Sequence, residues 1–221
     1  MFICIRAVTI ENTSVIRITM LVAIPAATGL AVLAPSVVYL LFSSTNEVAP
    51  TLLRIGGIGI VLFSLSSITS YILQGINHLY TPIKNALIAL VVHLLLMTSL
   101  LYFNDLKVYS IAISNNVFAF IMCFLNLKAI CKYLKYQQET NKTFVFPAIS
   151  ALAMGVSIFV LDLILNKNGY SRIKILFTVF VGVIIYFACM LLSKAIGKEE
   201  LTKLPGGTRI YSLLKKLRIM K

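Results

Sequence analysis

Few side chains in this sequence could do chemistry, and they stand inside or beside long apolar stretches. His93 lies in the middle of one such stretch, and Arg54 begins another. Ionisable groups at membrane depth are costly, so each is a site candidate. A histidine can carry a proton or donate a hydrogen bond to a sugar, and an arginine can hold a phosphate through two parallel bonds. The structural alternatives are His93 bonded to a neighbouring helix and Arg54 reaching to the membrane surface.

Two adjacent amides, Asn115 and Asn116, interrupt a third apolar stretch. Both cannot face lipid cheaply, so at least one is expected to face a cavity or a partner helix. Asn85 and Gln74 are candidates for the same polar interior. We therefore predict that the two asparagines bind substrate together with the histidine and the arginine named above.

No constellation typical of an enzyme is visible. The sequence has no Gly-rich phosphate loop, G-x-S-x-G or H-E-x-x-H. Asp162 is expected to pair with Lys167 or Arg172, which is a structural role. The four cysteines form no C-x-x-C pair and are interpreted as small hydrophobic side chains. The sequence therefore predicts no catalytic residue, no cofactor and no metal site.

The elements that must position these residues are long apolar helices. Hydrophobic residues make up 59% of the 221 residues and charged residues 12%, far from the roughly 25% charged of a soluble domain. A helix needs about 20 apolar residues to cross a bilayer. Six runs reach that length, and we predict an all-α membrane protein, a bundle of six transmembrane helices. The runs are Ile18–Phe42, Leu52–Gln74, Ile83–Phe103, Val108–Leu134, Phe144–Leu165 and Ile173–Ile196.

Proline positions support this division. Pro50, Pro82 and Pro147 stand at or just before the starts of runs, where a helix tolerates proline. Pro25 and Pro35 lie inside the first run, where each removes a backbone hydrogen bond and favours a kink. These two residues are candidate hinges, although many bent helices are only bent.

Small residues recur at a spacing of four, which lets helix backbones approach closely in a membrane. The pairs are Ala23/Ala27, Ser66/Ser70 and Ala151/Gly155, and Gly56, Gly57 and Gly59 add a smooth patch to the second run. The pattern predicts close helix packing and names no ligand.

The basic residues predict the topology. With both termini in the cytoplasm, 15 of the 20 lysines and arginines fall in the cytoplasmic segments and the tail, and five fall on the outer side. This excess of cytoplasmic basic residues favours that orientation. We expect the formal net charge of +13 to meet anionic lipid and not nucleic acid, because no basic stripe carries stacking aromatics. The five are Arg54, Lys107, Lys167, Arg172 and Lys174.

Three regions are predicted: a divergent segment at 1–17, the helix bundle at 18–196, and a basic tail at 197–221. In the tail, apolar residues at helical spacing are interleaved with cations, which is typical of a helix lying on an anionic membrane surface. A docking helix for another protein is the alternative. The cations are Arg209, Lys215, Lys216 and Arg218.

Several stretches, in this order and spacing, resemble the stage V sporulation protein B group of polysaccharide-biosynthesis membrane proteins, within the multidrug/oligosaccharidyl-lipid/polysaccharide exporter superfamily. The resemblance runs from about Val15 to the end, covering only the C-terminal portion of the family. Its pieces are Ile16–Thr19 with Ile24–Ala34 and Pro35, Tyr71–Gly75, Pro82–Asn85, and the ending Lys198–Leu201 with Leu204-Pro205 and Leu214–Arg218.

The resemblance implies one lobe of a flippase that moves lipid-linked polysaccharide or peptidoglycan precursors, such as those of the spore cortex, across the bacterial cytoplasmic membrane. A second polypeptide would supply the missing N-terminal helices, so the chain is expected to be a truncated or split form. His93 replaces the Lys or Arg expected in relatives. Two alternatives remain: a non-transporting scaffold in cell-envelope assembly, and a cation-coupled drug exporter of the same superfamily.

Overall fold

The computed structural model describes residues 2–43, 47–103, 107–134, 141–167 and 170–192. Within these ranges the chain is helical, with six helices long and apolar enough to cross a membrane. The predicted all-α membrane fold is confirmed. The elements are α1 (Phe2–Val32), α2 (Ala34–Phe42), α3 (Val48–Gly75), α4 (Tyr80–Phe103), α5 (Val108–Leu134), the short π-helix η1 (Asn141–Val145), α6 (Phe146–Leu165) and α7 (Arg172–Leu192).

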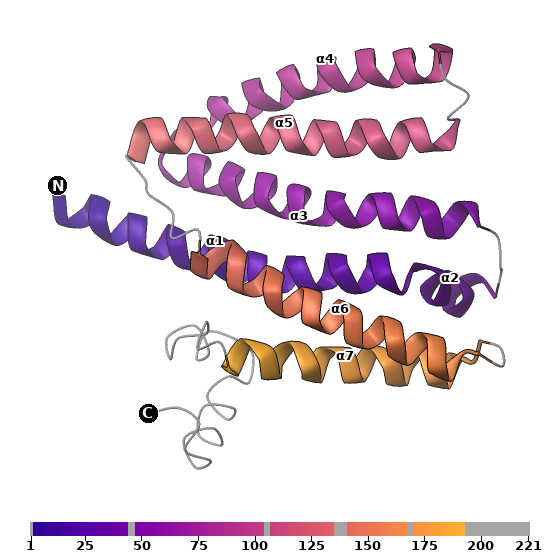
Figure 1. The fold of residues 1–221 in the computed structure, drawn as a ribbon. Helices are drawn as coiled ribbons and strands as arrows, with labels where there is room; N and C mark the ends of the chain where they lie inside the picture. Colours follow the sequence, from indigo (N-terminus) through magenta and orange to yellow (C-terminus); the bar gives the residue numbers. More distant parts are fainter. Residues whose placement is uncertain (1, 44–46, 104–106, 135–140, 168–169, 193–221) are drawn as a thin grey trace.

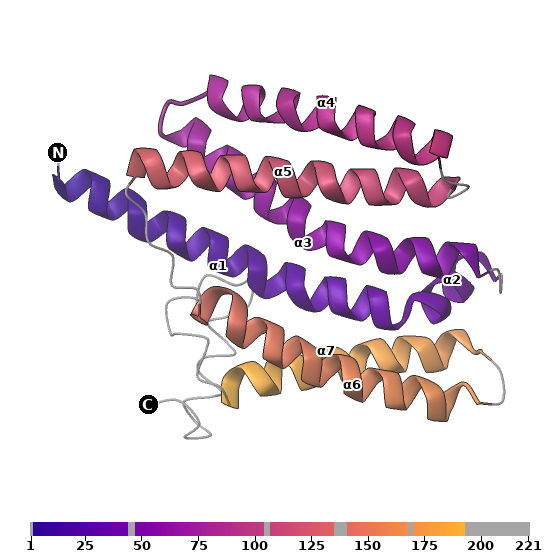
Figure 2. The ribbon, with the colours of Figure 1, turned by 45° about the horizontal axis from the view of Figure 1, so that its top comes forward.

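The helices form a row whose order differs from the chain order. From one edge to the other, the row runs α4, α5, α3, α1, α6, α7 (Figure 1). Helix α4 packs against α5 and touches α3 only slightly, so it is the most exposed of the spans. In the turned view α1 again lies between the α3–α5 side and the α6–α7 side, while α6 and α7 overlap (Figure 2). The first residues of α1 and the last residues of α7 lie on the same side of the bundle, at the left in Figure 1.

Helix α1 is shared by two apolar cores. One core joins Ile16 and Met20 of α1 to α3 and α5, for example through Leu73 and Ile130. The other joins Leu21, on a different side of α1, to α6 and α7. Because both cores use α1, this helix links the two halves of the row.

Small residues let the backbones approach, as their spacing predicts. A Cβ on Gly57 would lie 3.2 Å from the carbonyl oxygen of Ala27, where α3 crosses α1. A Cβ on Gly155 would lie 3.0 Å from Cγ2 of Thr28, and one on Gly182 would lie 2.7 Å from Cγ2 of Ile158. All three predicted small-residue pairs are buried. Close packing is therefore the role of these positions.

The first predicted run is two helices. Helix α1 begins at Phe2, 16 residues before the predicted start, and continues through Pro25 without interruption. The break comes at Leu33, and Pro35 stands in the first turn of α2, where its missing N–H costs little. The predicted disturbance near Pro35 is thus a helix break. Pro50, Pro82 and Pro147 all lie in first turns, as predicted.

Candidate functional site

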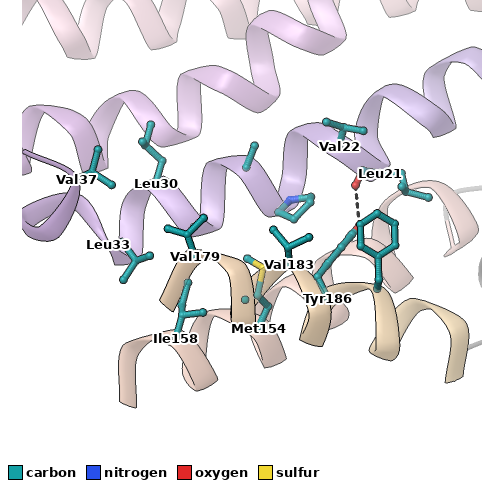
Figure 3. Close-up of a pocket in the computed structure, with 15 residues that line it drawn as sticks. Leu21, Val22, Leu30, Leu33, Val37, Met154, Ile158, Val179, Val183 and Tyr186 are labelled. Carbon is teal, nitrogen blue, oxygen red and sulfur yellow. Dashed lines mark hydrogen bonds between the residues drawn. The ribbon is translucent and has the colours of Figure 1, made fainter. Parts of the chain in front are cut away.

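An apolar groove lies between α1, α6 and α7. Its volume is about 410 Å³, in the range of ligand sites, and Val37 of α2 lies at one end (Figure 3). The walls are aliphatic and aromatic, and the groove opens sideways, because Val22 and Val183 are about half exposed. In a membrane-spanning row such an opening faces hydrocarbon. The groove can therefore accept a hydrocarbon chain and offers almost nothing to a polar ligand.

One polar group in the groove wall, the hydroxyl of Tyr186, is already used. It donates to the carbonyl oxygen of Leu21 at 2.8 Å, and the tyrosine is 3% exposed (Figure 3). In an α-helix that carbonyl would accept from the amide four residues on, which is Pro25 and has no N–H. Tyr186 of α7 thus supplies the donor that the proline removes from α1, as a neighbouring helix must in a membrane.

A polar cluster lies where α2 meets the α6–α7 hairpin. Oδ1 of Asp162 accepts from the hydroxyl of Ser36 at 2.8 Å and from Nδ2 of Asn166 at 2.7 Å. The expected pairing of Asp162 with Lys167 or Arg172 is not what the structure has. Arg172 donates instead to the hydroxyl of Ser43 at 3.1 Å. The role of the carboxylate remains structural, as expected, but its partner comes from the first predicted run.

His93 lies on the side of α4 that faces α5. Its ring meets Phe118 edge-on, with the ring centroids 6.0 Å apart and the planes at 76°. Its Nδ1 atom is buried and has no hydrogen-bond partner. Phe118 also packs against Phe63 of α3, with the ring centroids 6.2 Å apart. The histidine therefore sits in an aromatic line across three helices, with one nitrogen atom unused.

The other predicted binding residues differ in exposure and in hydrogen bonding. Arg54 and Asn115 are exposed, near the starts of α3 and α5. Asn116 is not available to a ligand in the same way, because its Nδ2 donates to the carbonyl oxygen of Ile55 at 2.8 Å. Of the two adjacent amides, one therefore joins α5 to α3 and the other faces outward. The prediction that at least one meets a partner helix agrees with this arrangement.

Asn126 joins three helices in the described part of the chain, and the sequence did not single it out. It is fully buried, and its Nδ2 lies within hydrogen-bonding distance of the Ser70 hydroxyl (2.8 Å), the Ser66 carbonyl oxygen (3.2 Å) and the Thr69 hydroxyl (3.3 Å). Its Oδ1 accepts from Nδ2 of Asn85 at 2.9 Å. Asn126 thus ties α5 to α3 and α4. Its position deep in an apolar run is the sequence feature that could have predicted a buried, hydrogen-bonded asparagine.

Asn85 therefore contributes to a polar interior, as expected, but Gln74 is exposed. The predicted membrane-surface cations Arg209, Lys215, Lys216 and Arg218 lie outside the described residues. Three cysteines have described side chains, and none of the three is in a disulfide: Cys123, Cys131 and Cys189. Among the described residues no group of histidine, cysteine and acidic side chains could hold a metal ion.

Fold and groove together define the class: a multi-pass, all-α membrane protein with six candidate spans in the described ranges and a laterally open apolar groove. No protein-family model and no curated protein matches the sequence.

Proposed function

We propose that this chain is one lobe of a membrane flippase for lipid-linked polysaccharide or peptidoglycan precursors, working against a second lobe on another polypeptide. The observation that carries the proposal is the groove between α1, α6 and α7. A lipid-linked saccharide keeps its hydrocarbon tail in the bilayer while its polar head crosses. A side-opening apolar groove suits such a tail, because burying apolar surface is favourable and no unpaired polar group opposes it.

The polar head needs separate contacts. Arg54 suits a pyrophosphate, since a guanidinium binds phosphate through paired hydrogen bonds. His93 of α4 and the outward-facing Asn115 of α5 are the proposed saccharide contacts. Both lie on the other side of α1 from the groove, so the head must extend past α1 and α3 to meet them. Asn116, the fourth residue predicted from the sequence, already bonds to α3. We therefore propose that it positions α5 and does not contact the substrate. In this scheme the head moves against a second lobe while the tail stays in the groove.

The proposed location is the bacterial cytoplasmic membrane with both termini in the cytoplasm. Six spans, with the start of α1 and the end of α7 on the same side of the bundle, are compatible with that topology. The excess of basic residues in the corresponding connections favours this orientation. Anionic lipid is the proposed partner of the basic tail.

The groove can be tested with a single fluorophore, because the sequence contains no tryptophan. Phe187→Trp places the reporter in the groove wall, and Phe124→Trp places a matched reporter on α5 away from it; the native side chains are 41% and 58% exposed. In lipid discs with brominated acyl chains, both tryptophans should be quenched. A polyprenyl pyrophosphate should then restore the fluorescence of Phe187→Trp and leave Phe124→Trp quenched. Equal responses at both positions would contradict a tail site in the groove.

The second lobe calls for a different experiment. A tag at the C-terminus of the native chain, purified from its own membranes, should bring down a membrane protein that supplies further spans. Recovery of the folded chain alone would contradict the two-lobe arrangement and favour the scaffold function.

A further inference from the structure

The short helix α2 is joined to α1 through a break at Leu33. Leu33 has φ −89° and ψ 17°, outside the helical values of the residues around it. Its amide still bonds to the Gly29 carbonyl oxygen at 2.9 Å, and its carbonyl oxygen accepts from Val37 at 2.8 Å. Pro35, two residues on, removes a further backbone donor. α2 therefore continues from α1 through a single irregular residue, which is the geometry of a hinge.

Three side-chain contacts hold α2 against the α6–α7 hairpin. Ser36, fully buried, donates to Asp162 of α6 at 2.8 Å. The ring of Tyr39 packs on that of Tyr170, with the ring centroids 5.2 Å apart. Ser43, directly after α2, accepts a hydrogen bond from the exposed Arg172 of α7. The first of these is the strongest, because its acceptor is a carboxylate and its donor is buried.

The same helix bounds the groove. Leu33 at the hinge and Val37 in α2 both line it (Figure 3). Leu41 and Phe42, at the far end of α2, are 68% and 71% exposed and add little packing there. That end is held by the Tyr39–Tyr170 ring contact, by the hydrogen bond from Arg172, and by packing of α2 against α3. A rotation of α2 about Leu33 would move Val37 relative to the groove wall while leaving α1 intact.

We propose that α2 is a hinged gate at the Leu33–Val37 end of the groove, held shut by the Ser36–Asp162 hydrogen bond. The inference rests on the proposed function only in taking the groove as a lipid site. The gate admits or releases a hydrocarbon chain at this end. The Ser36–Asp162 hydrogen bond, which we call the latch, sets how often the gate opens.

Spin labels on two exposed positions test the latch directly. Leu41→Cys in α2 and Ile173→Cys in α7, where the native side chains are 68% and 80% exposed, carry the nitroxides. The four native cysteines are replaced by alanine. Pulsed dipolar spectroscopy in lipid discs, without any polyprenyl ligand, should give one main distance. Ser36→Ala removes one oxygen atom and should add a second population with a longer distance between the two labels.

Two further variants at the latch separate the hydrogen bond from the packing around it. Asp162→Asn keeps an oxygen acceptor for Ser36 and should retain the single distance, whereas Asp162→Ala should open the gate as Ser36→Ala does. Asn166→Ala is the matched control, because Asn166 donates to the same Oδ1 of Asp162 from the residue directly after α6 and not from α2. It should leave the distance unchanged.

Unchanged distances in both Ser36→Ala and Asp162→Ala would overturn the latch. A longer population that appears equally in Asn166→Ala would also overturn it, since it would report loosening of the α6 end. Phe187→Trp supplies a second readout: in Ser36→Ala, a polyprenyl pyrophosphate should restore its fluorescence faster than in the parent chain. A changed distance with no fluorescence response at all would mean that α2 moves as inferred but the groove holds no such lipid, which separates the two proposals.

Discussion

The hydroxyl of Tyr186 donates to the carbonyl oxygen of Leu21, which Pro25 leaves without its helical donor. The bond links α7 to the interior of α1 across the wall of the groove. Without this bond, Pro25 would leave the carbonyl oxygen of Leu21 unpaired in hydrocarbon. The pair therefore explains how α1 passes through Pro25 as one helix, and it makes Tyr186 a structural residue of the groove.

Removing this hydroxyl should destabilise the chain only while the proline is present. Tyr186→Phe is expected to lower the free energy of unfolding by about 1 kcal/mol. In a Pro25→Ala background the new amide can bond to Leu21, so the same substitution should cost much less. A double-mutant cycle, measured by titrating purified protein with sodium dodecyl sulfate in mixed micelles, gives the coupling.

Tyr71→Phe is the control for that cycle, because Tyr71 is 64% exposed on α3 and should tolerate the change. Equal costs of Tyr186→Phe with and without Pro25 would show that the hydroxyl does not replace the missing donor.

Glycines on one helix should differ sharply in their tolerance of alanine. A Cβ on Gly59 would lie 2.5 Å from Oδ1 of Asn116, whereas a Cβ on Gly56 would meet nothing within 4 Å. Gly59→Ala must displace the Asn116 side chain from its bond to Ile55 and should cost about 1–2 kcal/mol. Gly56→Ala should be neutral or stabilising by up to about 1 kcal/mol, because alanine favours the helix. The same unfolding titration compares them, and equal effects would mean that α3 and α5 do not approach here as described.

Asn126 should matter more for stability than any other asparagine in α5. Asn126→Ala removes the group that joins Ser70 on α3 to Asn85 on α4, and we expect a loss of about 2 kcal/mol. Asn115→Ala, on the exposed side of the same helix, should leave the unfolding midpoint unchanged. If Asn115→Ala is the more damaging of the two, the assignment of structural and outward-facing asparagines is reversed.

The sequence predicts the spans because span length and hydropathy are local properties. Helix α5 has the predicted bounds, Val108–Leu134, and α6 ends at the predicted Leu165. The order of the row is not local: α3 packs on α5, two helices later, and not mainly on α4, which follows it directly. No spacing rule within one helix reveals such a choice, so the partner of an individual polar residue is equally hidden.

The polar residues show the same division. The polar character of Asn116 predicts a partner, but not that the partner is the carbonyl of Ile55. Asp162 has a chemically suitable cation nearby in sequence, yet the fold offers it Ser36 from 126 residues away. The sequence identifies which groups need a partner in the membrane, and the crossing of the helices determines which partner each receives.

His93 tests the binding assignment directly, because a binding residue and a packing residue predict opposite effects of its substitution on binding and on stability. Its buried Nδ1 has no partner, so His93→Phe, which keeps a ring against Phe118, should leave stability unchanged or raise it by up to about 1 kcal/mol. The same variant should weaken binding of a polyprenyl pyrophosphoryl disaccharide, and His93→Gln, which keeps hydrogen-bonding capacity, should retain part of it. Retention of a radiolabelled polyprenyl pyrophosphoryl disaccharide by the purified chain measures binding of the whole substrate, because Phe187→Trp reports only on a groove that α4 does not line. The detergent titration measures stability. Reduced stability with unchanged binding would instead make His93 a packing residue that bonds within the row.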